Sequence, residues 1–511
     1  MREQAPEQLE PLYPNLQDNI TRVLEELHYA SDIVLRELLI GTEEAPLRAA
    51  LFYTEGLVDT QSLHHYLMEP LMLKMDPAVW AAVLQAEEGF LQRLKNDVLT
   101  VAAIMEIADF DNLFTALLSG NVILLFDGFD VGFLLSLKGW EARAITEPST
   151  ESIIRGPRDS FTETLRTNTA LIRRRIRDTR LRVEQRMVGR STKTDVAIMY
   201  IEGIANETVV EEVRVRLDRI DLDSVLESSF IEEEIQDRTT TPFPTIFNTE
   251  RPDVVCANLL EGRVAIVVDG TPFVLTVPAL FVEFFQSADD YYQRSDISTL
   301  LRFLRLLCFF IALIGPSLYI AITTFHQEML PTQLLISLAA QREGVPFPAF
   351  IEALVMEITF EILREAGVRM PRAIGQAMSI VGTLVIGTAA VDAGIVSAAM
   401  VIVVSITAIS TFVFPAFNMG ISVRILRFGL MGLAASFGIF GIIVGLIALV
   451  LHLCSLRSFG VPYMSPLAPM QISDQKDVLL RVPRWMMLTR PHLISSWNNV
   501  RQKSNRPKQR Q

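Results

Sequence analysis

The sequence predicts an α+β soluble N-terminal head of two small α/β-type subdomains, followed by an α-helical multi-span transmembrane domain. Charged residues almost disappear from three long stretches of the last third, at 306–325, 373–423 and 428–456. A helix needs about 20 consecutive apolar residues to cross the bilayer core, so these stretches are long enough to span it. The first 300 residues instead alternate short strand-like runs with helical patterns, which is typical of small mixed domains.

The charge balance separates the same two parts. Residues 1–302 contain 50 acidic and 29 basic residues, whereas the remainder contains 9 acidic and 17 basic residues. A head this acidic repels nucleic acid, so no nucleic-acid partner is expected. The N-terminus lacks the apolar core of a signal peptide, and three scattered cysteines cannot form a disulfide framework. We therefore expect a cytoplasmic head.

The first subdomain is expected at 16–145, after a loose, Pro-rich N-terminal arm at 1–15. Apolar residues recur at helical spacing through 16–118, which predicts helices there. Two strand-like runs follow, at 122–126 and 131–137. The Asp-Gly pair between them predicts a hairpin.

The second subdomain is expected at 146–300. It is predicted to contain a strand at 196–201 and a polar, mostly solvated helix at 207–220. A second Asp-Gly pair separates 263–268 from 273–277 and predicts another hairpin. No internal repeat is evident from the sequence.

The transmembrane domain is expected at 301–456, and a basic C-terminal tail occupies 457–511. The predicted spans lie at about 303–325, 374–391, 394–417 and 428–455, and an amphipathic helix is predicted at 346–366. The basic tail favours a cytoplasmic C-terminus and an even number of spans. Arg424 and Arg427 would then face outward, and counting the amphipathic helix as a fifth span would reverse both assignments.

Glu357, Glu361 and Glu365 follow i, i+4 spacing on the amphipathic helix and so share one face. Carboxylates are costly in contact with lipid. Either the helix lies flat at the membrane interface with this face in water, or the face lines an aqueous path that favours cations. Glu357 and Glu361 are therefore pore-lining candidates.

A second group of pore-lining candidates follows from the predicted span at 374–391. Small residues fall on one face of this helix, where they suit either close helix packing or a narrow pore wall. Asp392, in the short turn after it, is either a helix-end charge among headgroups or an ion-attracting residue at a pore mouth. The candidates are Gly375, Ser379, Gly382, Thr383, Ala390 and Asp392.

Six arginines between 173 and 182 form a cationic run within the acidic head. The favoured interpretation is a solvated helix face that pairs with acidic neighbours such as Glu232, Glu233 and Glu234; a phosphate or headgroup site is the alternative. No catalytic motif is present, so neither an enzyme nor a cofactor or metal site is expected.

From Thr146 onward the chain resembles the A subunits of GerA-type spore germinant receptors. The matching stretches cover about 320 residues in the expected order. They include TEPSTESIIRGPRDSF (146–161), PFPTIFNTERPD (242–253), GRVAIVVDGTPFVL (262–275), SADDYYQR (287–294), the segment 325–367 and SFGVPYMSP (458–466).

This resemblance implies a multi-pass protein of the bacterial spore inner membrane that takes part in spore germination. Its implied partners are further copies of itself, a transporter-like B subunit that binds the nutrient and a lipoprotein C subunit. It also implies that A subunits form a ring around an ion channel, which releases monovalent cations when nutrient binds. No catalytic residue follows from the family.

Two alternatives stay open. The chain is either a conducting subunit or a non-conducting scaffold that clusters germination complexes. It is equally compatible with a paralogue of the stage V sporulation A operon, the F-type protein, which acts beside the dipicolinate channel.

Overall fold

The computed structural model describes residues 10–502 except 43–44, 73–88, 96–98, 100, 102, 140–146, 149–150, 152, 370–386 and 496–497. The N-terminal part of the chain is built on a five-stranded antiparallel sheet. The strand order is β1-β2-β4-β5-β3. The strands are β1 (Ile33–Thr42), β2 (Ala45–Thr54), β3 (Ile104–Ile107), β4 (Val122–Phe126) and β5 (Gly132–Leu135).

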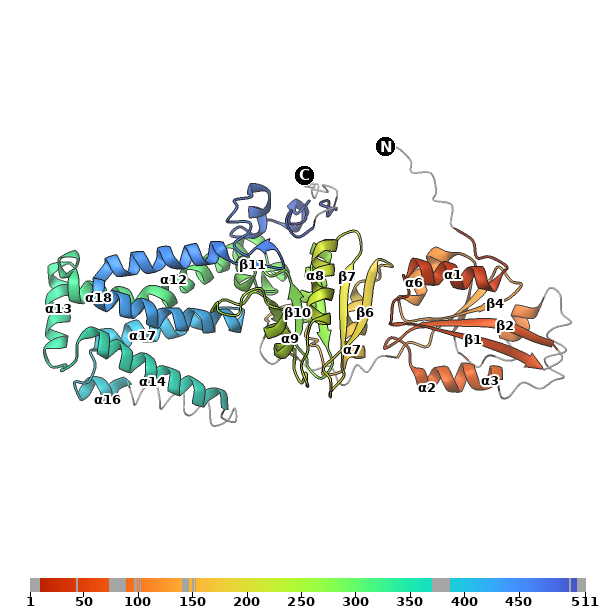
Figure 1. The fold of residues 1–511 in the computed structure, drawn as a ribbon, viewed down its shortest axis with the longest axis horizontal. Helices are drawn as coiled ribbons and strands as arrows, with labels where there is room; N and C mark the ends of the chain where they lie inside the picture. Colours follow the sequence, from red (N-terminus) through yellow and green to blue (C-terminus); the bar gives the residue numbers. More distant parts are fainter. Residues whose placement is uncertain are drawn as a thin grey trace, which may run out of the picture. The chain divides into compact units, whose positions relative to one another are not determined.

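Helices cover both faces of this first sheet (Figure 1). On β2, Phe52 packs with α1 (Leu16–Glu26) and α6 (Phe110–Leu117), while its neighbour Leu51 faces the segment containing α2 (Thr60–Leu63), η1 (His64–Met68) and α3 (Glu69–Met72). Successive strand residues point to opposite faces, so one strand supplies both cores. A further short helix, α5, spans Phe90–Arg93.

The prediction that 16–118 is helical is correct for helices such as α1 and α6 and wrong for β1, β2 and β3. Strands β1 and β2 pair antiparallel from Ile33 opposite Thr54 to Thr42 opposite Ala45. On β1, Leu38 and Ile40 are buried while Leu39 between them is 66% exposed, which is the alternation of a strand with one buried face. The predicted hairpin between 122 and 137 is confirmed by the pairing of β4 with β5.

The second sheet has the order β6-β7-β9-β10-β8 and is also antiparallel. Its strands are β6 (Leu181–Val188), β7 (Thr194–Ile201), β8 (Phe247–Thr249), β9 (Val264–Val268) and β10 (Val274–Val277). Its helices are α7 (Leu165–Arg175), α8 (Glu207–Asp218), α9 (Ser228–Ile235) and α10 (Pro252–Glu261). The predicted strand at 196–201, helix at 207–220 and second hairpin are confirmed as β7, α8 and the β9–β10 pair.

The two sheets have the same strand order and form a structural repeat that is not evident in the sequence. Numbered from its own first strand, each sheet has the order 1-2-4-5-3. The hairpin aspartates play the same part in both: Asp127 Oδ1 accepts from Leu16 N at 3.1 Å, and Asp269 Oδ1 accepts from Leu165 N at 2.8 Å.

A buried asparagine is repeated as well. Asn19 exchanges two hydrogen bonds with the backbone of Tyr13, and Asn168 exchanges the same two with the backbone of Thr162. The apolar residues that pack the two cores differ. The repeat therefore survives mainly in the polar residues that fix helix starts and hairpin turns.

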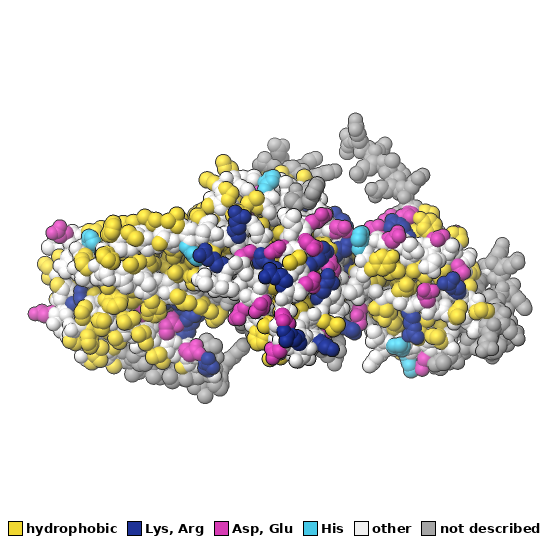
Figure 2. Space-filling model, viewed as in Figure 1, with side chains coloured by type: hydrophobic (Ala, Val, Ile, Leu, Met, Phe, Trp, Pro, Cys, Tyr) yellow, Lys and Arg dark blue, Asp and Glu magenta, His cyan; other side chains and the backbone are white. Residues whose placement is uncertain are grey.

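The chain divides into two units that each contain segments distant in sequence. The head consists of Met1–Gln236, Ile246–Pro278 and Thr489–Arg501, and the helical unit consists of Asp237–Thr245, Ala279–Leu488 and Gln502–Gln511. Side chains of both charge signs cover much of the strand-containing part, whereas apolar side chains cover the long helices (Figure 2).

Among the residues that the structure describes, five helices dominate the helical unit: α12 (Ser295–Phe325), α13 (Thr332–Glu343), α14 (Ala349–Arg369), α17 (Ala398–Thr411) and α18 (Phe417–Ser455). Shorter elements precede and follow them: η3 (Phe281–Phe285), α11 (Asp289–Tyr292), η4 (Gln327–Met329), α16 (Gly387–Asp392), β11 (Arg457–Ser458), β12 (Val461–Pro462), η6 (Ile472–Asp477) and η7 (Arg484–Met486).

Within the described residues, α12 and α18 are the two helices long and apolar enough to cross a membrane by length and composition. They include the predicted spans 303–325 and 428–455. The predicted span 394–417 corresponds to α17, a shorter apolar helix of 14 residues. Most of the predicted span 374–391 lies outside the described residues, and the amphipathic helix predicted at 346–366 is present as α14.

Helix α18 reverses direction at Gly438, whose φ of 62° and ψ of −143° are not helical. A Cβ placed on Gly445 would lie 2.6 Å from Leu430 Cδ2, a contact that a straight helix cannot make. Residues 417–437 and 439–455 are therefore two antiparallel arms of a helical hairpin. Phe325 and His326, at the end of α12, pack against the turn.

A buried polar junction joins the start of α12 to the segment after α18. Asp290 Oδ2 accepts from Arg302 Nε at 3.0 Å and from Arg305 Nη1 at 2.7 Å. Arg302 also donates through Nη1 to Asp477 Oδ1 at 3.0 Å. The segments on either side of the helix bundle in sequence therefore meet at one end of it, here called the near end.

Candidate functional site

Five charged side chains converge in the interior of the helix bundle, and we call this group the charge cluster. Glu357, Glu361 and Arg364 come from α14, and Arg424 and Arg427 come from the first arm of α18. Spacings of three and four residues put each set on one face of its helix. The two faces meet because α14 and α18 pack against each other.

The closest contacts are ion pairs between the two helices. Arg424 Nη1 lies 2.5 Å from Glu361 Oε2, and Arg427 Nη2 lies 3.2 Å from Glu357 Oε2. The same Nη2 atom lies 3.8 Å from Glu361 Oε1. Arg364 places its guanidinium 5.6 Å from the ring centres of both Phe412 and Phe417.

Burial makes the central pair energetically important. The side chains of Glu357 and Arg427 are 0% and 1% exposed. Alanine, isoleucine, valine and methionine side chains form the neighbouring apolar core of the bundle. Removing one partner of a buried ion pair typically costs about 3–5 kcal/mol, because the other charge is left uncompensated.

The predicted carboxylate stripe therefore does not present a single water-facing surface. Along α14 the carboxylate exposure rises from 0% at Glu357 through 27% at Glu361 to 66% at Glu365. At Glu357 the stripe enters the protein interior and meets arginines, so in this structure it faces neither water at a membrane interface nor an open aqueous path. The arginines that raised the topological conflict are the partners of these carboxylates.

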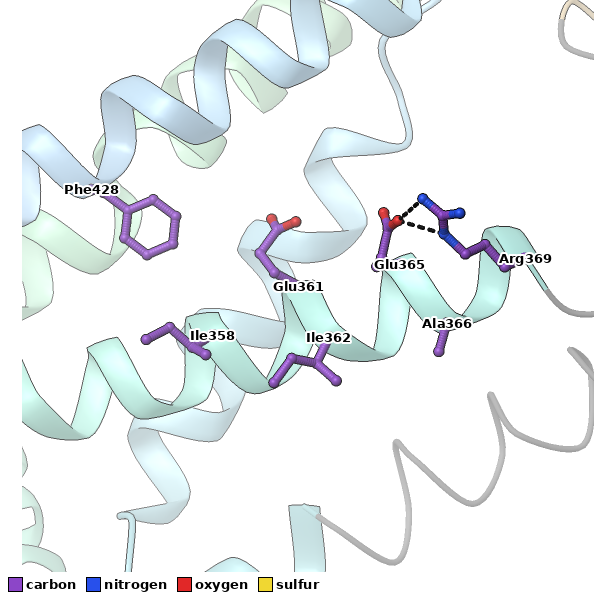
Figure 3. A pocket seen from close by; sticks show the side chains of 7 residues that line it. All are labelled: Ile358, Glu361, Ile362, Glu365, Ala366, Arg369 and Phe428. Carbon is purple, nitrogen blue, oxygen red and sulfur yellow. Dashed lines mark hydrogen bonds and ion pairs between the residues drawn. The ribbon is translucent and has the colours of Figure 1, made fainter.

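An open groove of about 710 Å³ runs along the outer part of the stripe (Figure 3). It is lined by Ile358, Glu361, Ile362, Glu365, Ala366, Arg369 and Phe428. Glu361 and Glu365 extend from α14 on the side where Phe428 of α18 lies, and Glu365 is paired with Arg369 at 2.7 Å. The charge cluster is thus adjacent to an accessible surface.

A fourth carboxylate of α14, that of Glu352, lies at the other end of the stripe, before Glu357 in the sequence. Glu352 is fully buried and accepts from the backbone N–H of Ser397 at 2.7 Å, at the start of α17. It also bonds the Ser397 hydroxyl, which lies 3.4 Å from the Tyr319 hydroxyl of α12. Carboxylates stabilise helix N-termini, so Glu352 holds α17 against α14.

The structure describes only part of the other predicted pore group. Gly375, Ser379, Gly382 and Thr383 lie outside the described residues. Ala390 is half-buried, and Asp392 is exposed at the end of α16.

The arginine run in the head has a different role from the one predicted. Arg173 is completely buried and forms a bidentate pair with Asp32, at 2.7 and 3.0 Å. Arg174 and Arg175 pair with Asp159. The prediction that Glu232–Glu234 supply the partners is wrong, because α7 packs its basic end against the turn before β1.

Sequence reasoning identified Glu357 and Glu361 and missed their partners. From the sequence alone, Arg424 and Arg427 are treated only as charges flanking a span, although two arginines three residues apart in an apolar stretch point to a buried carboxylate partner. Across the described ranges, no group of three or more His, Cys, Asp or Glu side chains is arranged to hold a metal.

The described residues thus form a strand-rich head and an apolar helix bundle with a buried charge cluster, and two of the helices are long and apolar enough to cross a membrane. The family model described as Bacillus/Clostridium GerA spore germination protein matches residues 21–493. The chain belongs to this family of germinant receptor A subunits.

Two individual relatives agree with this assignment. Spore germination protein KA of Bacillus subtilis (strain 168) is 51% identical, over 97% of this chain and 89% of its own. Stage V sporulation protein AF of the same organism is 31% identical over 93% of both chains. A solved structure is also similar, the crystal structure of the N-terminal domain of the A subunit of the Bacillus megaterium spore germinant receptor GerK3. The sequence identity is 41%, the TM-score is 0.42, and the match covers 54% of this chain and 98% of that chain.

Proposed function

We propose that this chain is the A subunit of a nutrient-sensing spore germinant receptor, in which several copies form a cation channel in the spore inner membrane. Family membership over almost the whole chain supports the receptor role. The observation that supports conduction is the charge cluster, because buried ionisable groups between apolar helices usually mark ion pathways. A transporter-like B subunit would bind the nutrient, and a lipoprotein C subunit would complete the receptor.

The proposed topology has the head in the cytoplasm and an even number of membrane passages. Asp290, before the bundle, and Asp477, after it, both contact Arg302, so the chain enters and leaves at the near end. The α18 hairpin is compatible with this, because it returns the chain to the end where it began. Both arginines of α18 are then inside the bundle, which removes the conflict between them and the basic tail.

The pore would be lined by Glu357 and Glu361 of α14 together with the small-residue face at Gly375, Ser379, Gly382, Thr383 and Ala390. Asp392 would attract cations at one mouth. Glu357 and Glu361 contribute selectivity in this proposal, since carboxylates favour cations over anions.

The test is potassium efflux from liposomes that contain the full-length chain with its B and C subunits. Amino acids, nucleosides and sugars are added in turn, and efflux is expected with at least one. Glu357→Gln with Glu361→Gln should reduce the rate at least tenfold, whereas the matched exposed variant Glu365→Gln should keep it. Nutrient binding by the complex without any efflux would contradict the channel and favour a scaffold.

A role beside the dipicolinate channel is the second candidate, since stage V sporulation protein AF is also a relative. The identity of 51% to spore germination protein KA against 31% to protein AF favours the germinant receptor.

A further inference from the structure

Glu357 is an incompletely compensated carboxylate in the interior of the bundle. Its side chain is 0% exposed, and neither of its oxygen atoms has a hydrogen-bond partner among the described residues. An isolated carboxylate in apolar surroundings is strongly disfavoured, so it either has a countercharge or takes up a proton. Arg427 is the only described basic residue within 4.0 Å of it.

The geometry of Arg427 differs from that of a structural ion pair in the same chain. Arg173 donates two parallel hydrogen bonds to Asp32, and this bidentate geometry is the strongest kind of arginine–carboxylate contact. Arg427 makes no hydrogen bond through Nε, Nη1 or Nη2 within the described part of the chain. Its Nη2 instead lies between two carboxylates, 3.2 Å from Glu357 and 3.8 Å from Glu361, as a bound cation would.

The neighbouring arginines cannot replace Arg427 in this position. Arg424 is held at the other oxygen of Glu361, at 2.5 Å. Arg364 directs its charge over the rings of Phe412 and Phe417. Loss of the Arg427 charge would therefore leave Glu357 to take up either a proton or a cation from solution, and the groove beside Glu361 provides access.

We propose that Glu357 and Glu361 form a binding site for a monovalent cation, and that Arg427 occupies this site as a tethered cation in the structure described here. Movement of the α18 arm would withdraw the guanidinium and admit an ion from solution. The proposal deepens the channel function proposed above and rests on it for its role. Cation binding at the site can nevertheless be measured without any conduction.

The experiment measures thermal unfolding of the full-length protein in detergent as potassium chloride replaces N-methyl-D-glucamine chloride at constant ionic strength. Arg427→Gln should show a midpoint that rises with potassium, because a ligand that binds only the folded state stabilises it. Wild type and Arg427→Lys, which keep the tethered charge, should show no such rise. Arg369→Gln is the matched control, because it removes the exposed partner of Glu365 on the same helix.

The double variant Glu357→Gln with Arg427→Gln identifies the site. It should fold and should lose the potassium dependence, since it has no carboxylate at 357. A midpoint of Arg427→Gln that follows pH but not potassium would mean that Glu357 takes up a proton, and it would overturn the proposal. The same potassium dependence in the double variant would also overturn it.

If Arg427→Gln does not fold, the same salt series still tests the proposal. Its recovery as folded protein is then measured in potassium chloride against N-methyl-D-glucamine chloride. Better recovery in potassium supports the site, whereas equal recovery or none in both salts overturns it. Absence of efflux from wild-type receptor would contradict the channel but would not affect these results.

Discussion

Glu151 is a largely buried carboxyl group of the head. Burial raises its pKa to about 7, although a hydrogen bond from the Thr249 hydroxyl at 2.5 Å and the nearby Arg251 oppose this. The folded head therefore holds a proton on Glu151 that the unfolded chain releases near its ordinary pKa of about 4.5. Stability due to this group is present below about pH 4.5 and is lost as the pH rises through 7.

We expect Glu151→Gln to stabilise the head above pH 7, by at most about 3 kcal/mol, because it removes the cost of a buried charge. Below pH 4.5 the variant and wild type should be alike. Hydrogen exchange at the backbone amides of β8, measured on the full chain at both pH values, provides the comparison. Glu147→Gln, which changes an exposed carboxylate paired with Arg158, should show no pH-dependent difference. Equal exchange in wild type and Glu151→Gln at pH 8 would contradict the assignment.

Arg173 provides a second prediction for a single residue. Its removal in Arg173→Ala leaves Asp32 buried without a partner and should destabilise the head by about 3–5 kcal/mol. Arg174→Ala, which breaks a longer and partly exposed pair with Asp159, should cost about 1 kcal/mol or less. Chemical unfolding monitored by exchange in β1 and β6 measures both. Similar losses in the two variants would show that burial of Arg173 is not what stabilises this contact.

At the scale of elements, the α18 hairpin depends on one glycine. Gly438 adopts a backbone conformation that is nearly exclusive to glycine, and a Cβ there would lie 2.7 Å from His326 Cε1. We expect Gly438→Ala to lower the thermal midpoint of the purified protein. Gly432→Ala in the first arm, where a Cβ would meet nothing within 4 Å, should leave it unchanged or raise it. A Gly438→Ala protein as stable as wild type would contradict the reversal.

The elements that sequence reasoning predicted were those with a local signal. Asp-Gly pairs predicted both hairpins because the pair itself favours the turn. Strands β1 and β2 were missed, since three adjacent apolar residues from Leu38 to Ile40 fit a helix as well as a strand and only pairing decides between them. Gly438 was missed because it is one of several glycines in α18, and none of the others interrupts the helix.

For a related reason, the sequence predicted only the carboxylates of the candidate site and not the arginines that pair with them. The spacing of Glu357 and Glu361 is a property of one helix, so it can be read from the sequence. Their pairing with Arg427 and Arg424 depends on how α18 folds back and packs on α14, which is a tertiary contact. The repeat of the two sheets was hidden in the same way, because it is preserved in single polar residues near the helix starts, such as Asn19 and Asn168, and not in a continuous pattern.

For the whole molecule, the two ends of the helix bundle should lie on opposite sides of the membrane. Met329 follows α12 at the far end and Met470 lies in the segment at the near end, and both are well exposed. In a background with Cys256, Cys308 and Cys454 replaced, Met329→Cys and Met470→Cys should react with a membrane-impermeant thiol reagent from opposite sides of oriented vesicles. Labelling of both from one side would refute the proposed topology.

The return of residues 489–501 to the head has a practical consequence for dissecting the protein. Arg490 donates to the Leu260 carbonyl at 2.8 Å, Arg501 pairs with Glu261 at the same distance, and Ile494 and Ser495 are buried. A recombinant fragment that stops at Pro278 thus lacks one of its own pieces. A synthetic peptide of residues 489–501 should bind such a fragment and raise its solubility. The fragment and the peptide would then reconstitute the head from two separately made molecules.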